Sequence, residues 1–214
     1  MLKPKSPPPK PKSPPPKPKK AGEVVTLNAQ DMVKYYILMI ESRNDGRIGQ
    51  TELYIPQNYL DLLDKNTWGP FIKKYGQRWY SNAHVWIPVY NSNDKYWMFV
   101  TINKFDTNIT YVKVYDPIKR PNKSQTKINN LIKDFMNRFD KYIKIQFEWV
   151  KCPKASDKSY SSLYIIEFMR RIFNNELIGD KYDPVVLNEK YKYEIKNKKI
   201  VKYEFIERMH KKKK

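Results

Sequence analysis

Apolar side chains recur at helical spacing in three parts of the chain. The first lies within residues 24–43, where Asn28 predicts a helix N-cap and Asp31 lies three residues later beside the first-turn amides. Residues 124–142 have one apolar face, and an almost continuously apolar run near 161–174 predicts a buried central helix. The apolar positions are Met32, Tyr35, Tyr36, Met39 and Ile40; Ile128, Leu131, Ile132, Phe135 and Phe139; Leu163, Ile165, Ile166, Phe168, Met169 and Ile172.

Between the first two helical patterns the spacing changes to that of strands. Residues 84–91, 95–105 and 108–117 read as three strands joined by turn-forming Asn, Ser, Asp and Thr residues, which predicts an antiparallel meander. Residues 143–150 alternate as a further strand. The order of three strands, a helix, a strand and a helix predicts an α+β fold.

Two segments are less regular. Residues 51–80 combine a short extended piece, broken by Pro56, with one or two short helices. Residues 191–214 alternate apolar and charged side chains, which predicts a hairpin or a frayed extension.

Composition fits one domain with basic ends. The chain has 214 residues, 40% of them hydrophobic, which is enough for one sizeable core. Its formal net charge is +20, but residues 1–20 hold seven lysines and no acid, and four more lysines end the chain. We therefore expect a disordered Lys/Pro-rich arm over residues 1–22, a domain over 23–205 and a basic tail over 206–214.

The arm repeats the heptad KPKSPPP from Lys3, and its prolines favour a solvated polyproline II conformation. Three interpretations remain open: a spacer, a nuclear-import or polyanion-binding arm, and a ligand for a proline-recognising module. Nucleic acid is therefore a candidate partner of the lysine-rich ends.

Cysteine and apolar content restrict the class of protein further. Cys152 is the only cysteine, so an intramolecular disulfide is excluded and a reducing nuclear or cytoplasmic location is expected. The sequence has no apolar run of membrane-spanning length, so no membrane partner is expected. One cysteine and two distant histidines give no metal-ligand spacing, and the sequence indicates no cofactor.

The predicted topology brings three candidate positions of a catalytic site close together. Tyr96 and Trp97 begin one predicted strand, Asp116 ends the next, and Ser161 opens the central helix. Antiparallel neighbours place the start of one strand beside the end of the next. A helix N-terminus presents unpaired amides that lower the pKa of a thiol and stabilise an oxyanion. This geometry suits a base, an orienting carboxylate and a nucleophile.

The stretches NSNDKYW, VKVYDPI and SDKSYSSLYIIEFM resemble, in order and spacing, the motifs of papain-like cysteine proteases that process ubiquitin-like modifiers, the SUMO- and NEDD8-specific proteases. The resemblance spans about residues 25 to 175 and implies a central antiparallel-rich sheet flanked by helices. It implies that Trp97 is the family tryptophan, a candidate binding residue, and that Asp116 is the acidic member. A ubiquitin-like modifier or its conjugate is then a candidate partner.

The resemblance also implies that the catalytic groups are replaced. Tyr96 holds the histidine position, Ser161 the nucleophile position, and Ala155 the position of the oxyanion glutamine, with Lys154 as the neighbouring option. A phenol with a pKa of about 10 is a poor base near pH 7, and a serine hydroxyl needs an adjacent base to attack. We therefore expect an inactive member of the family that retains protein binding.

Two alternatives remain. The first is an active cysteine peptidase using Cys152, because His84, Asp116 and Cys152 occur in the family's order of His, Asp and Cys, although neither His84 nor Cys152 lies at its motif position. The second is a basic nucleic-acid or chromatin-associated binding module in which the fold serves as a scaffold.

Overall fold

A computed structural model describes residues 27–42, 51–53, 61, 64–81, 83–104 and 109–212. The Lys/Pro-rich arm, Pro56, the turn after the second predicted strand and the last two lysines lie outside these residues. Within the described residues, no helix is both long enough and apolar enough to cross a bilayer.

One five-stranded sheet in the order β1-β2-β3-β4-β5 organises the described residues. The central strands β2 (His84–Asn91), β3 (Tyr96–Asn103) and β4 (Thr110–Tyr115) pair antiparallel, which confirms the predicted meander. The edge strands β1 (Thr51–Leu53) and β5 (Ile145–Trp149) pair parallel to β2 and β4.

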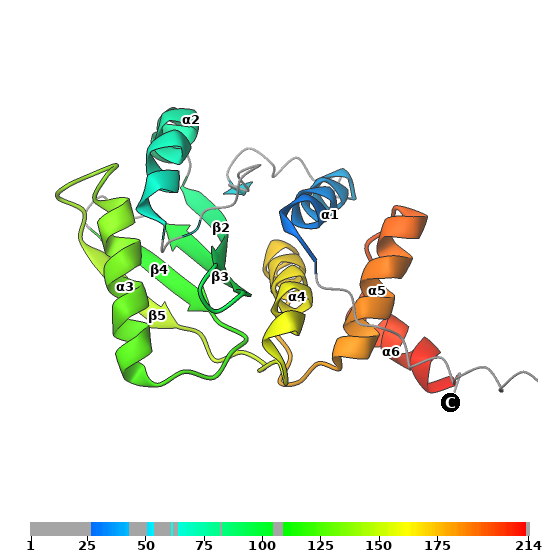
Figure 1. Cartoon of the computed structure of the whole chain (residues 1–214). Coiled ribbons are helices and arrows are strands. Elements are labelled where there is room, and N and C mark those ends of the chain that lie inside the picture. Colours follow the sequence, from blue (N-terminus) through cyan, green and yellow to red (C-terminus); the bar gives the residue numbers. More distant parts are fainter. Residues whose placement is uncertain are drawn as a thin grey trace, which may run out of the picture.

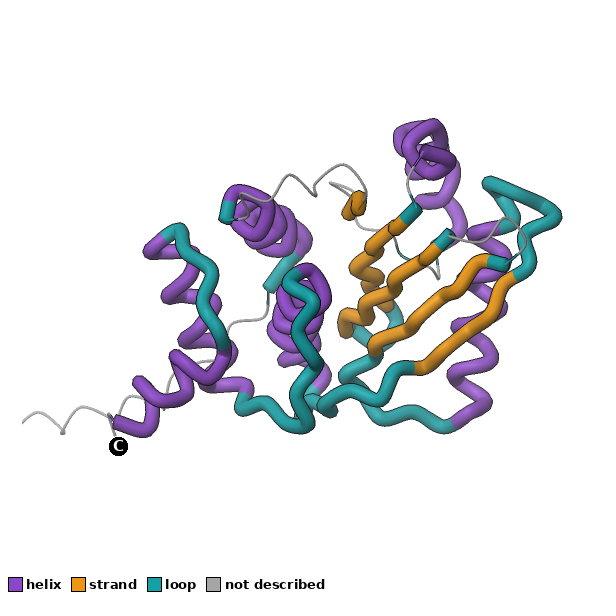
Figure 2. The backbone as a smooth tube through the Cα atoms, turned by 180° about the vertical axis from the view of Figure 1, so that it is seen from behind, coloured by secondary structure: helices purple, strands orange, loops and turns teal. Residues whose placement is uncertain are grey.

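Helices cover both faces of this sheet (Figures 1 and 2). The helices α2 (Trp68–Ser81) and α3 (Asn122–Met136) cover one face. The central helix α4 (Ser161–Phe173) covers the other, with α1 (Ala29–Glu41), α5 (Pro184–Asn197) and α6 (Tyr203–Lys212) packed beyond it. The predicted α+β class and the buried helix near 161–174 are confirmed.

The two faces of β3 contribute to two different cores. Tyr96 and Met98 pack with the side chains of α2 and α3, whereas Trp97 and Phe99 pack with those of α1 and α4. This alternation is the period of two of a strand. Almost the whole of β3 is buried, because helices cover both sides of it.

The predicted cap of the first helix is confirmed in detail. The Asn28 side chain accepts a hydrogen bond from the Asp31 amide at 3.0 Å, and the Asp31 carboxylate accepts one from the Asn28 amide at 3.1 Å. Each residue satisfies an amide of the other, as in a capping box.

The predicted hairpin or frayed extension after residue 190 is wrong, because these residues form the second half of α5 and all of α6. Asp183 caps α5 by accepting a hydrogen bond from the Val185 amide, and Lys198 ends it in the left-handed conformation. Helix α6 crosses the expected boundary at residue 205, and Ile206 in it is buried.

A cluster of buried charges joins the central helix to its neighbours. Glu167 lies in the middle of α4 and contacts Arg170 at 2.8 Å, Arg171 at 2.7 Å and Lys190 of α5 at 3.2 Å. Lys190 also pairs with Glu194 at 2.8 Å. Because every one of these side chains is at most 9% exposed, each charge depends on its partners in place of water.

The cluster predicts loss of stability in acid. Burial raises the pKa of Glu167, but Lys190 and Arg170 outweigh this effect and hold the pKa at about 2. An unfolded glutamate protonates near pH 4.5, so Glu167 stabilises the fold above that pH by roughly 3 kcal/mol, and this contribution is lost as the pH falls towards 2. Urea unfolding between pH 6 and pH 2.5 should show this fall. A Glu167→Gln variant should show a smaller one, and equal pH slopes would contradict the assignment.

Candidate functional site

The candidate site lies where β3 begins, β4 ends and α4 begins. The Ser161 hydroxyl, at the first residue of α4, accepts a hydrogen bond from the Trp97 amide at 2.9 Å. The Ser162 hydroxyl accepts one from the Leu27 amide at 3.1 Å. Both serines are at most 1% exposed, so the start of α4 is sealed against β3 and against the residues that precede α1.

Tyr96 is fully buried and its phenol is engaged within the core of the α2–α3 face. The hydroxyl accepts a hydrogen bond from the Asn91 side chain at 3.0 Å and donates one to the Met98 sulfur at 3.5 Å. The Arg120 guanidinium lies 4.4 Å above the centre of the ring, a cation–π arrangement. The Tyr96 side chain therefore fills a structural position on the face of the sheet opposite α4.

Asp116 is 1% exposed and has two partners in its own loop. Arg120 contacts one carboxylate oxygen, and the other accepts a hydrogen bond from the Ile118 amide at 2.7 Å. Burial raises the pKa of the Asp116 carboxyl to about 7, while the Ile118 amide and the Lys154 ammonium act in the opposite direction. The Arg120 contact also favours the ionised form. Arg120 thus contacts both residues, the ring of Tyr96 and the carboxylate of Asp116.

The residues before α4 run along the end of β4. Cys152 and Lys154 both donate to the Asp116 carbonyl oxygen, at 3.3 Å and 2.6 Å, and the Ala155 amide donates to the Pro117 carbonyl at 2.8 Å. Burial raises the pKa of the Cys152 thiol above its usual value, although Lys154 acts against this shift. Cys152 is therefore held in its thiol form and is 7% exposed, which does not favour a nucleophile.

The structure does not bring His84 to this site. His84 pairs with Asn103 across the sheet, and its ring nitrogen lies 2.8 Å from the Asn103 side chain, whereas Asn91 at the other end of β2 pairs with Tyr96. Seven residues of strand separate the two ends by about 23 Å. Cys152 lies beside Asp116, near the Tyr96 end. A base must lie within hydrogen-bond reach of its nucleophile, so the geometry gives the Cys152 alternative no support.

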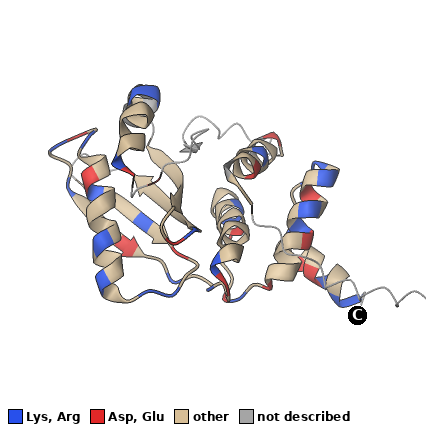
Figure 3. Ribbon diagram, in the orientation of Figure 1, with Lys and Arg blue, Asp and Glu red and all other residues tan. Residues whose placement is uncertain are grey.

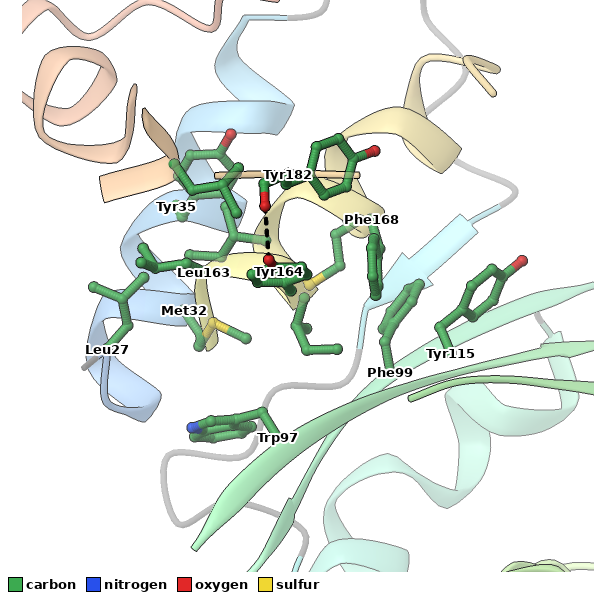
Figure 4. Close-up of a cluster of buried hydrophobic side chains, with 14 of the residues drawn as sticks. Leu27, Met32, Tyr35, Trp97, Phe99, Tyr115, Leu163, Tyr164, Phe168 and Tyr182 are labelled. Carbon is green, nitrogen blue, oxygen red and sulfur yellow. Dashed lines mark hydrogen bonds between the residues drawn. The ribbon is translucent and has the colours of Figure 1, made fainter. Parts of the chain in front are cut away.

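Trp97 lies in the core between the sheet and the helices. Its side chain points towards Leu27 and Met32 in Figure 4, and its ring centroid lies 5.0 Å from that of Tyr90 on β2, with the two rings tilted by 49°. Nearby, the Tyr164 hydroxyl donates to the Tyr182 carbonyl at 2.9 Å, the dashed line in Figure 4. Trp97 is 4% exposed. Its role as a binding residue stays a prediction, and in this structure it is a core residue.

Among the described residues, the side chains of Tyr96 and Ser161 lie on opposite faces of the sheet. A serine nucleophile needs a base that takes its proton. The Ser161 hydroxyl accepts a hydrogen bond from the Trp97 amide, and the Tyr96 phenol points to the other face of the sheet, out of reach of this hydroxyl. The role of Tyr96, Asp116, Ser161 and Ala155 as the family's catalytic positions stays a prediction from the motif order.

Sequence reasoning missed two residues that organise the site. Arg120 connects Tyr96 with Asp116, and Asn91 binds the Tyr96 hydroxyl. Arg120 follows Asp116 by four residues, but only the fold shows that its guanidinium covers an aromatic ring. Asn91 lies at the start of a predicted turn, where asparagine is common for local reasons.

No protein-family model matches this chain, and no curated protein sequence does. Solved structures do match. A de-sumoylating protease aligns over 86% of this chain and 71% of its own, with a TM-score of 0.56 and 19% identity. The Ulp1 protease domain in complex with Smt3, the yeast ortholog of SUMO, aligns over 80% and 77%, with a TM-score of 0.56 and 11% identity. XopD of Xanthomonas campestris, bound to ubiquitin, aligns over 85% and 96%, with a TM-score of 0.60 and 10% identity.

The five-stranded sheet, with the buried helix α4 against one face and α2 and α3 against the other, defines an α+β domain. More particularly, the chain has the fold of the SUMO protease Ulp1 and of the effector protein XopD, which confirms the papain-like fold that the motif resemblance implied.

Proposed function

We propose that this domain is a catalytically inactive relative of the ubiquitin-like-modifier proteases that binds a ubiquitin-like modifier or its conjugate. The observation that carries the proposal is the position and burial of the Tyr96 side chain. The motif order gives it the position of the catalytic histidine, and its side chain is buried against Arg120 on the face of the sheet away from α4.

The remaining residues of the motif support the loss of catalysis. Ser161 lies at the start of α4, where its hydroxyl accepts a hydrogen bond from a backbone amide. Removing a single oxyanion donor typically costs roughly 100-fold to 1000-fold in rate, and here the base and the thiol are replaced as well. Binding, in contrast, depends on the shape of the fold. Ulp1 and XopD carry this fold in complexes with SUMO and with ubiquitin.

Binding is tested with SUMO, NEDD8 and ubiquitin that carry intact C-terminal tails. We expect a dissociation constant of micromolar or tighter for at least one of them by isothermal titration calorimetry. The same modifier without its tail is the control for docking in a protease-like groove. No binding of any of the three at micromolar concentrations would overturn the modifier-binding part of the proposal.

Inactivity is tested separately with modifier-based electrophilic probes. We expect no covalent labelling of the purified chain, because the only thiol is buried and its pKa is raised. Labelling that Cys152→Ser abolishes and Ser161→Ala leaves intact would establish a cysteine peptidase using Cys152. Labelling abolished by Ser161→Ala would establish a serine nucleophile. Either result would contradict the inactive assignment.

A further inference from the structure

A group of lysines surrounds the candidate site on its outer side. We define the basic rim as Lys95, Lys119, Lys123, Lys151, Lys154 and Lys158, all of them exposed. They come from three separate segments: the turn before β3, the residues after β4 with the start of α3, and the residues before α4. Figure 3 shows Lys and Arg gathered along the loops that lead from β4 to α3 and from β5 to α4.

Contacts of the described residues hold these segments together. The Lys154 ammonium donates to the Asp116 carbonyl oxygen at 2.6 Å, and the Ala155 amide joins the same segment to Pro117. The Lys158 ammonium lies 3.4 Å from the Asp94 carboxylate, next to Lys95. Lys119 and Lys123 follow Asp116 closely in sequence. The contacts therefore bring the three lysine-bearing segments together where β3 begins and β4 ends.

The lysines of this surface outnumber its acidic groups. Asp116 is buried against Arg120, Asp94 contacts Lys158, and Asp157 accepts hydrogen bonds from the amide and hydroxyl of Ser159. The rim therefore carries a positive excess that its own acids do not neutralise. Such a surface attracts a partner of opposite charge and disfavours a basic one.

We propose that the basic rim binds an acidic peptide segment of a partner protein. Asp94 and Asp157 are exposed among these lysines. A nucleic-acid strand carries a phosphate at every nucleotide, whereas a peptide can place acidic side chains opposite the lysines and uncharged ones opposite Asp94 and Asp157. The inference goes beyond the proposed function, because the surface lies outside the buried motif residues and requires neither catalysis nor a modifier tail.

The test compares two variants of the full chain with equal net charge. The rim variant carries Lys119→Glu, Lys123→Glu and Lys151→Glu. The control variant carries Lys192→Glu, Lys196→Glu and Lys199→Glu, which are exposed and lie on α5 or just after it. Both retain the lysine-rich ends, so any attraction by those ends is the same in the two variants. Circular dichroism checks folding, and a set with Gln at the same three rim positions provides a milder second test.

The probe is a fluorescein-labelled decaglutamate peptide, measured by fluorescence anisotropy at low and at physiological salt. We expect the rim variant to bind at least about tenfold more weakly than the control variant, and the Gln set to fall between them. Equal weakening in the two Glu variants would overturn the proposal in favour of net charge alone. Rim-dependent binding of an oligothymidine without rim-dependent binding of decaglutamate would also overturn it, in favour of nucleic acid.

The outcome is separable from the test of modifier binding. Failure of all three modifiers to bind, with rim-dependent decaglutamate binding intact, would overturn the proposed function alone. Modifier binding with no difference between the rim and control variants towards decaglutamate would overturn the rim proposal alone.

Discussion

Replacing Glu167 by glutamine is expected to lower the free energy of unfolding by about 3–5 kcal/mol. Glu167 is 1% exposed and is a direct partner of Arg170, Arg171 and Lys190. Glutamine has nearly the same shape but no charge, so the variant leaves buried cations with one counter-charge fewer. Its amide group would also point a donor towards other donors. Urea denaturation at pH 7, with a check that the slope is unchanged, measures the loss.

Glu204→Gln is the matched control. Glu204 pairs with the same Arg171 at 2.6 Å, but its side chain is 54% exposed, so water replaces the lost interaction. We expect a loss below about 1 kcal/mol. Similar losses in the two variants would show that burial of the cluster does not govern its contribution.

The buried charges around Glu167 also explain why the sequence pattern did not predict helix α5. Tyr191, Tyr193 and Ile195 alternate with charged residues, which reads as a strand. In the structure the buried positions of α5 include Lys190 and Glu194 together with Val186 and Leu187. A pattern of apolar positions does not show a helix whose core face contains charges, here Lys190 and Glu194, which pair with each other and with groups on α4 and α1.

Signals confined to a few neighbouring residues predicted the structure correctly. The cap formed by Asn28 and Asp31 depends on residues three apart, and the meander depends on short turns between apolar strands. The sequence also predicts that Tyr96 begins a strand, that Asp116 follows the next strand and that Ser161 begins a helix. The opposite faces of Tyr96 and Trp97 follow from strand geometry, but which of them faces α4 depends on how the whole sheet packs.

The contacts of Arg120 with Tyr96 and Asp116 could not be predicted from the sequence. Replacing Arg120 gives the second large expected loss of stability. Replacing Arg120 by methionine is expected to destabilise the fold by about 3–5 kcal/mol at pH 8, because the buried Asp116 carboxylate loses its cation. The ring of Tyr96 loses its cation–π contact at the same time. Methionine retains much of the apolar volume of the arginine stem, so a cavity contributes little to the expected loss.

The dependence on pH distinguishes loss of the ion pair from loss of packing. Burial already raises the pKa of Asp116 to about 7, and removal of Arg120 raises it further. A carboxyl with a raised pKa in the folded state binds its proton there at a pH where the unfolded chain has released it. The folded state therefore gains stability relative to the unfolded state as the pH falls from 8 towards 5. The deficit of Arg120→Met should shrink over this range, as measured by urea denaturation at the two pH values.

Asp116→Asn completes the double-mutant cycle. In the background of Asp116→Asn no buried carboxylate remains at this position, so the further change Arg120→Met should cost much less at pH 8 than it costs in the original chain. The double variant should also lose the pH dependence assigned to Asp116. A deficit of Arg120→Met that is the same at pH 5 and pH 8, and the same in the Asp116→Asn background, would mean that Arg120 acts through packing on Tyr96 alone. Asp116 would then have no electrostatic role in holding the loop after β4.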